Sequence, residues 1–251
     1  MAEPLLRIDQ VSQRFGGLLA LDAASFAAEA GRITALIGPN GAGKTTLFSI
    51  VTGFQQPVSG RIVYDGVDIT GLPPHRLARR GLARTFQVAQ PFARLTVREN
   101  IAVGAHLHRR ARADALAAAA QVAAAIGLAG ELDQPAEALT VAGRKRLELG
   151  RALAIEPRLL LLDEVLAGLN PSEVRDMVPV IRSIAARGVT MVMIEHIMQA
   201  VMSLAERVFV LSQGRIIAEG APHEIAADPR VVEAYLGHGA AQRMTAGPAH
   251  D

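Results

Sequence analysis

Nine consecutive residues have the types and spacing to hold a phosphate group: Gly38, Pro39, Asn40, Gly41, Ala42, Gly43, Lys44, Thr45 and Thr46. They fit the pattern G-x-x-x-x-G-K-[ST] without a mismatch, and its glycines allow backbone N–H groups to turn toward a phosphate. We expect Lys44 to reach the outer phosphates and the Thr45 hydroxyl to bind Mg²⁺. A glycine-rich turn that fits by accident is the alternative. The flanking strand and helix described below favour nucleotide binding.

Two carboxylates follow a wholly apolar stretch. Leucines 159–162 precede Asp163 and Glu164, and ligands of open α/β sheets bind where the strands end. Asp163 is predicted to hold Mg²⁺ mainly through water, and Glu164 to polarise the water that attacks the γ-phosphate. Alone, such a pair would be interpreted as a solvated strand end. Combined with the phosphate loop, it favours a catalytic role.

His196 and Gln87 are weaker candidates, because each would by itself be an ordinary polar residue; His196 follows Glu195 at the end of an apolar stretch. The stretch before His196 and the one before Asp163 are predicted to be parallel strands that end at the same sheet edge. His196 would then face the same phosphate as Glu164. Gln87 is predicted to end a further short strand, where its amide could contact both Mg²⁺ and the attacking water.

The elements that must position these residues alternate between strands and helices, which predicts an α/β fold on a mainly parallel sheet. Around the phosphate loop, the pattern predicts a strand over 32–37 and a helix that starts near Thr45 and ends at Gly53. An antiparallel β subdomain is expected from short edge strands and a hairpin. The predicted strands are 5–15, 20–28, 61–64, 83–86, 158–162, 189–194 and 207–211.

Residues 88–155 follow a helical pattern and are interpreted as an inserted helical subdomain. Thr96 is a candidate N-cap for a helix over 97–105, and an alanine-rich helix should follow Arg112. We predict one domain over residues 1–236, with 1–87 and 156–236 as its core and antiparallel β subdomain. The remainder, 237–251, is predicted to be a flexible tail.

The composition argues against several classes of protein. The chain of 251 residues is 50% hydrophobic, which supports one compact domain with a large core. It has no cysteine, so disulfides and thiolate metal sites are excluded. A net charge of +2 gives no reason to expect nucleic acid. No signal peptide or spanning segment is expected, so other chains would have to hold the protein at a membrane.

From about residue 5 to residue 237, the chain resembles the ATPase subunits of ATP-binding cassette (ABC) transporters, because the phosphate loop, Gln87, a helical segment, Asp163-Glu164 and His196 follow in that family's order. The resemblance implies a P-loop (RecA-like) core and a head-to-tail dimer that holds ATP between its subunits. It also implies that Gln87 starts a loop sensing the membrane partner, and that Phe15 stacks on adenine. From chemistry alone, Phe15 could equally be a core residue.

The signature region departs from the family's usual Leu-Ser-Gly-Gly-Gln. Here Leu139 is followed by Thr140, Val141, Ala142 and Gly143. The resemblance implies that these residues act on the ATP of the partner subunit. Thr140 keeps a hydroxyl that could contact the γ-phosphate. Ala142 adds a methyl group at a position where the backbone closely approaches the phosphate. We therefore expect the ATP site that this signature forms with the partner subunit to work, but to be the weaker of the two.

Several phrases resemble one branch of the family, the importers of branched-chain amino acids, and within it the LivG type of ATPase subunit. They are residues 15–21, 84–87, 167–171 and 233–237. Val165 stands where the family usually has proline, which is expected to alter loop stiffness rather than chemistry. These phrases do not encode the solute, and related importers are thought to serve amides, urea and other organic acids.

The resemblance implies an ATPase that couples Mg·ATP hydrolysis to uptake. Its implied partners are a second ATPase subunit, identical or different, two transmembrane permease subunits and an extracytoplasmic solute-binding protein. It would lie on the cytoplasmic face of the cell membrane. Two alternatives stay open: a soluble ABC ATPase of DNA repair or translation, and a regulatory subunit whose hydrolysis is weakened by the atypical signature.

Overall fold

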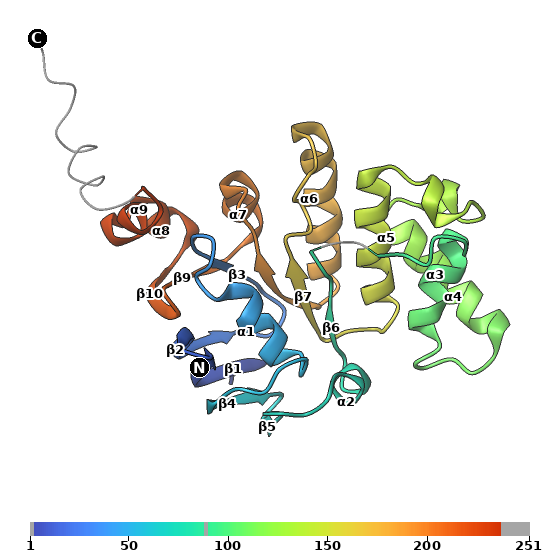
Figure 1. The fold of residues 1–251 in the computed structure, drawn as a ribbon. Coiled ribbons are helices and arrows are strands. Elements are labelled where there is room, and N and C mark those ends of the chain that lie inside the picture. The colour runs from blue at the N-terminus through green and yellow to red at the C-terminus, as the bar shows by residue number, and fades with distance from the viewer. Residues whose placement is uncertain (1–2, 88–89, 237–251) are drawn as a thin grey trace, which may run out of the picture.

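The computed structural model describes residues 3–87 and 90–236, which form two sheets and the helices around them (Figure 1). The antiparallel sheet has the order β2-β1-β4-β5, and the six-stranded sheet has the order β10-β9-β3-β8-β7-β6. In the second sheet, β6, β7, β8, β3 and β9 are parallel, while β10 pairs with β9 in the antiparallel sense. The expected α/β fold with a mainly parallel sheet is confirmed.

The strands run over Leu6–Phe15 (β1), Leu18–Ala28 (β2), Ile33–Ile37 (β3), Ser59–Tyr64 (β4), Val67–Asp68 (β5), Leu82–Arg84 (β6), Leu159–Asp163 (β7), Thr190–Ile194 (β8), Arg207–Ser212 (β9) and Arg215–Gly220 (β10). The helices are Lys44–Val51 (α1), Pro74–Arg79 (α2), Val97–Ala105 (α3), Arg112–Ala125 (α4), Val141–Leu153 (α5), Pro171–Ala185 (α6), Met198–Leu204 (α7), Pro222–Ala227 (α8) and Pro229–Leu236 (α9).

Alternation along the central strands divides the core into two clusters. Leu159 and Leu161 of β7 pack in one cluster with β1, β2, β4 and α1, while Leu160 and Leu162 pack in the other with α6 and α7. This follows from the period of two along a strand. Helix α1 therefore lies between the two sheets (Figure 1), and the phosphate loop at its start is fixed from both sides.

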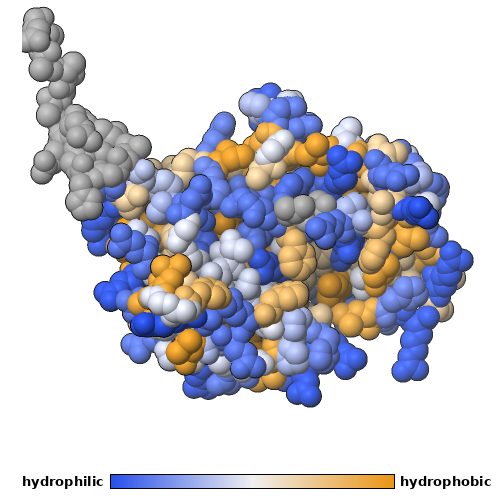
Figure 2. Space-filling model, viewed as in Figure 1, coloured by the Kyte–Doolittle hydropathy of each residue, from blue (hydrophilic) through white to orange (hydrophobic). Residues whose placement is uncertain are grey.

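Helices α3, α4 and α5 lie together on one side of the molecule, away from the antiparallel sheet (Figure 1). Thr96 caps α3 as expected, since its hydroxyl accepts from the N–H of Glu99 while the Glu99 carboxylate accepts from the N–H of Thr96. The division into a core and a helical subdomain stays a prediction, and the predicted tail lies outside the described residues. From this view, the surface carries hydrophobic side chains among many hydrophilic ones (Figure 2).

Two details of the sequence prediction are wrong. Strands β1 and β2 have 10 and 11 residues, and β1 is an inner strand between β2 and β4 rather than a short edge strand. Gln87 does not end a strand, because β6 ends at Arg84 and Gln87 lies in the bend that follows. The bend carries Gln87 away from the ladder, where its side chain can turn toward other elements.

Candidate functional site

The phosphate loop connects β3 to α1 and depends on two glycines for its path. Gly38 has φ +152°, and a Cβ atom there would lie 1.9 Å from the carbonyl oxygen of Leu211. Gly43 has φ +106°, and its Cβ would lie 2.5 Å from the carbonyl oxygen of Ala20. Any side chain at either position would clash with backbone, so the loop's shape requires glycine at both places.

Lys44 is folded back over the loop that precedes it. Its Nζ atom donates to the carbonyl oxygens of Gly38 at 2.7 Å and Pro39 at 3.0 Å. The residue is buried, and this burial lowers its pKa, opposed by the nearby charges of Glu164 and Asp163. The ammonium group is thus held at the mouth of the loop by groups that a phosphate could replace.

A cavity of about 490 Å³ lies over the loop and brings several predicted residues together. Phe15 borders it from the end of β1 and is 47% exposed, so it is not a core residue. Gln87 and Glu164 border the same cavity, while Gly38 and Pro39 do not. The loop residues that line it are Asn40, Gly41, Ala42, Gly43, Lys44, Thr45 and Thr46.

Glu164 is held between two predicted site residues. Its Oε2 accepts from Nε2 of Gln87 at 2.7 Å, and its Oε1 lies 2.8 Å from Nε2 of His196. Its backbone has φ +48°, and its N–H donates to the carbonyl oxygen of Ile194 at 3.0 Å. This left-handed conformation turns the side chain out of β7 toward His196, so side chains from three segments meet at one carboxylate.

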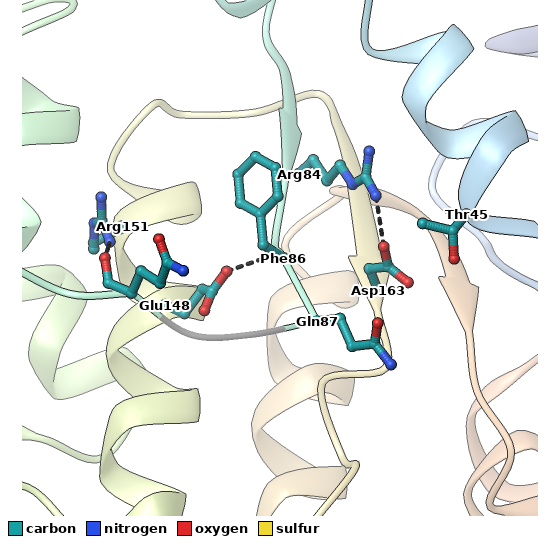
Figure 3. A pocket seen from close by; sticks show the side chains of 8 residues that line it. Thr45, Arg84, Phe86, Gln87, Glu148, Arg151 and Asp163 are labelled. Carbon is teal, nitrogen blue, oxygen red and sulfur yellow. Dashed lines mark hydrogen bonds and ion pairs between the residues drawn. The ribbon is translucent and has the colours of Figure 1, made fainter. Parts of the chain in front are cut away.

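Asp163 lies one residue earlier and is almost fully buried. Its Oδ2 pairs with Nη2 of Arg84 at 2.6 Å, while its Oδ1 has no hydrogen-bond partner. Asp163, Thr45 and Gln87 border a second cavity of about 480 Å³, which Figure 3 shows from close by. Carboxylate, hydroxyl and amide oxygens are the donors that Mg²⁺ prefers, so the three residues fit the predicted metal.

Glu195 is a buried carboxylate beside this site. Its Oε1 accepts from the N–H of Leu166 at 3.0 Å. Desolvation by burial, together with the nearby charge of Glu164, raises its pKa to about 7. Glu195 therefore ties the end of β8, next to His196, to the loop that follows Glu164.

The signature residues lie at the start of α5 and do not border the cavity over the phosphate loop. Thr140 is the N-cap of this helix, and its Oγ1 accepts from the N–H of Gly143 at 3.1 Å. Thr140 and Val141 are exposed, whereas Ala142 is half-buried. An anion supplied from outside the chain can therefore reach the start of α5.

Sequence reasoning missed Arg84, Lys145 and Glu148. Arg84 and Lys145 bond to the predicted site residues Asp163 and Gln87, while Glu148 accepts from the N–H of Phe86, next to Gln87. These three bonds join residues 58 to 79 positions apart, and the further bond of Lys145 to Glu164 spans 19, so no local pattern reveals them. Tyr235 of α9 is a further case. Burial raises the pKa of its phenol, and a hydrogen bond from the backbone N–H of Gly38 opposes that rise. The sequence phrase containing Tyr235 had indicated only the branch of the family.

Two family models match the chain. One is described as ABC transporter and matches residues 21–167; the other is described as branched-chain amino acid ATP-binding cassette transporter and matches residues 215–241.

In the residues that the structure describes, no helix is long and apolar enough to cross a membrane. Within the same residues, no group of three or more histidine and acidic side chains is placed to bind a metal.

Two curated relatives are similar in sequence to this chain over nearly its full length. The high-affinity branched-chain amino acid transport ATP-binding protein BraF of Pseudomonas aeruginosa is 39% identical, with 94% of this chain and 99% of BraF covered. LivG of Escherichia coli, which has the same description, is 38% identical at the same coverage. Neither relative is named as a repair or translation protein, so the soluble alternative gains no support.

Solved structures agree with the fold. One is the ADP conformation of MJ1267, an ATP-binding cassette of an ABC transporter, with a TM-score of 0.86 and 31% identity. The match covers 94% of this chain and 100% of the MJ1267 chain. CbiO1 of Clostridium perfringens, part of the ABC transporter complex cbiONQ, has a TM-score of 0.83 and 27% identity, with 92% and 94% covered.

Proposed function

The chain belongs to the ABC transporter family as one of its ATPase subunits, and from this premise we propose that it drives import of branched-chain amino acids or a related small solute. ATP would bind at the phosphate loop, with Phe15 against the adenine. Hydrolysis would supply the free energy for movement of the permeases.

The observation that carries the proposal is the position of Glu164. Its carboxylate borders the cavity over the phosphate loop and is held by Gln87 and His196, each within 2.8 Å. We propose that Glu164 takes the proton of the attacking water, and that His196 stabilises the charge that develops on the γ-phosphate. In the present structure, Oε2 of the carboxylate accepts from Gln87, and the remaining lone pairs of the two oxygens are available to accept from water.

Lys44 and the metal ligands would complete the site. Lys44 would exchange its two carbonyl partners for phosphate oxygens. Thr45, Gln87 and Asp163 would hold Mg²⁺, with Asp163 mainly through water; the unpartnered Oδ1 of Asp163 supports this assignment. When bound, the metal would neutralise charge on the phosphates.

We propose that the working unit is a head-to-tail dimer with a second ATPase subunit, identical or different. Thr140, Val141, Ala142 and Gly143 would contact the ATP of that partner, which agrees with their distance from this chain's own cavity. Two permeases and an extracytoplasmic solute-binding protein would complete the importer, at the cytoplasmic face of the cell membrane. We expect no nucleic acid partner.

A groove beside Gln87 supports the permease contact. It encloses about 500 Å³ between β6 and the helices α3 and α5, and its apolar lining includes Phe86, Val103, Leu107 and Ile155. Phe86 and Val103 are each 47% exposed. Exposed apolar side chains of this kind typically mark a protein contact.

Glu164→Gln tests the catalytic assignment in the complex with its cognate permeases in liposomes. We expect the variant to bind ATP with affinity close to that of the wild type and to lose ATP hydrolysis and leucine uptake together. Lys44→Ala should lose ATP binding as well. Normal phosphate release by Glu164→Gln would refute the role of Glu164, and ATP hydrolysis by the wild type without uptake of any amino acid would refute the assignment to amino-acid import.

A further inference from the structure

Three side chains on one face of α5 hold the main chain around Gln87. The Nζ atom of Lys145 donates to the carbonyl oxygen of Gln87 at 2.9 Å, and the Glu148 carboxylate accepts from the N–H of Phe86. Nη1 of Arg151 donates to the carbonyl oxygen of Gln90 at 2.9 Å. Since Lys145, Glu148 and Arg151 are spaced three residues apart, they share one face of the helix. Figure 3 shows Glu148 and Arg151 on the helix beside Phe86 and Gln87.

Lys145 also reaches the strand that carries the proposed base. The same Nζ atom donates to the carbonyl oxygen of Glu164 at 3.2 Å. One ammonium group therefore joins the signature helix to two residues whose side chains meet at 2.7 Å, Gln87 and Glu164. A change in the position of α5 moves the hydrogen-bond donor of both.

Lys145 and Glu148 are both buried, each with 8% of its surface exposed. Among the ion pairs of the described residues, Lys145 has no carboxylate partner within bonding distance; its hydrogen bonds go to main-chain carbonyls. Burying a charged group is costly unless its hydrogen bonds are made, and an apolar side chain of similar length would fill the space without that cost. What the lysine adds is a fixed geometry between α5 and the two carbonyl groups.

We propose that Lys145, supported by Glu148 and Arg151, is a positioning residue that transmits movement of the signature helix to Gln87 and Glu164. This inference rests on the proposed function, because it assigns those two residues to hydrolysis. When a partner's ATP draws the start of α5 toward it, the main-chain groups of Phe86, Gln87 and Gln90 that bond to the helix are moved with it. The contact between the Gln87 amide and the Glu164 carboxylate is then set by the position of α5.

Arg146 provides a matched control on the same helix. Its Nη1 also donates to a main-chain carbonyl at 2.9 Å, but the acceptor is Ile126, in the turn that ends α4. Arg146→Met removes a bond of the same kind within the helical segment. Lys145→Met removes the bonds that cross from α5 to Gln87 and Glu164, and Lys145→Arg keeps a cationic donor at that place.

The experiment measures three quantities on the reconstituted complex: the dissociation constant of a fluorescent ATP analogue, kcat for ATP hydrolysis, and amide hydrogen exchange over residues 82–92 with and without Mg·ATP. For Lys145→Met we expect kcat to fall by about 10- to 100-fold, as for other small misplacements of catalytic groups. The dissociation constant should change by less than about 2-fold, since Lys145 does not border the cavity over the phosphate loop. The effect of Mg·ATP on exchange over residues 82–92 should disappear.

Lys145→Arg should recover most of kcat and of the exchange response, and Arg146→Met should keep both. Wild-type kcat and a wild-type exchange response in Lys145→Met would overturn the inference. An equal loss in Lys145→Met and Arg146→Met would also overturn it, because a general loss of helix stability would then explain both. A failure of the proposed function itself is separate: it would appear as hydrolysis that survives Glu164→Gln.

Discussion

The guanidinium of Arg84 lies 2.6 Å from the carboxylate of Asp163, and the two side chains are 7% and 1% exposed. Arg84 also lies over the rings of Phe48 and Phe86. The pair is thus a buried contact between β6 and β7 at the edge of the proposed metal site. Removing one partner of such a pair is far more costly than removing both, because the remaining charge has no counterion.

Arg84→Met should therefore lower the free energy of unfolding by about 3–5 kcal/mol, which chemical denaturation would measure. The double variant with Asp163→Asn should regain a large part of that loss, since no unpaired carboxylate is left in the interior. If the double variant is no more stable than Arg84→Met alone, the ion pair does not carry the stability assigned to it.

Phe15→Ala should weaken ATP binding by about 5- to 150-fold, since stacking on a base is worth about 1–3 kcal/mol. The melting temperature should hardly change, because Phe15 is half exposed and lies outside both core clusters. Calorimetric titration and a thermal melt check the two halves of this expectation. Phe15→Trp should retain affinity, and a loss of stability without a loss of affinity would contradict the stacking role.

Glu195 makes stability depend on pH. Because the folded state raises its pKa from 4.5 to about 7, folding favours the protonated form. That contribution is fully present below pH 4.5 and is lost as the pH rises through about 7. Glu195→Gln should remove this dependence, so the variant should gain up to about 3 kcal/mol relative to wild type at pH 8.

The check on Glu195 is urea denaturation at a series of pH values. Glu164→Gln serves as a second variant, because the charge of Glu164 is one of the causes that raise the pKa of Glu195. Removing that charge should lower the pKa of Glu195, so the stability curve of this variant should bend at a lower pH than that of wild type. Parallel curves for wild type and Glu195→Gln would show that folding does not change the pKa of Glu195.

Thr140→Val removes both the cap of α5 and the hydroxyl proposed for the partner's γ-phosphate. Loss of the cap should cost about 1 kcal/mol of stability, while Thr140→Ser should be close to neutral. In a reconstituted complex, Thr140→Val should reduce ATP turnover, and Ala142→Gly should increase it by removing the methyl from the phosphate approach. Unchanged ATP turnover in both variants would contradict the prediction that this signature weakens hydrolysis.

The sequence predicted the parts of the fold whose signals are local. The leucines of β7, the glycine loop before α1 and the Thr96 cap of α3 each carry their pattern within a few residues. Helix α6 was not predicted, although Asn170 and Glu173 form a capping box at its start. Strand β10 gave little signal because, as the outer strand of its sheet, it has only two buried residues, Ala218 and Gly220.

The parts that the sequence could not supply depend on long-range contacts. β1 has apolar residues typical of many strands, and nothing in them tells that β4 pairs on its second side. The same holds for the site. The approach of Lys145 to Gln87 and of Arg84 to Asp163 depends on how α5 and β6 are placed by the whole fold.

The enclosure of α1 between two sheets has a consequence for how this chain can vary. Leu47 and Phe48 of the helix are buried against strands that belong to both sheets, only a few residues after Lys44. A substitution that loosens this packing cannot be confined to stability, since it would also shift the backbone amides that surround a phosphate. Substitutions that adapt the protein to a new solute are therefore expected on surfaces that do not contact the nucleotide, rather than in the packing around α1.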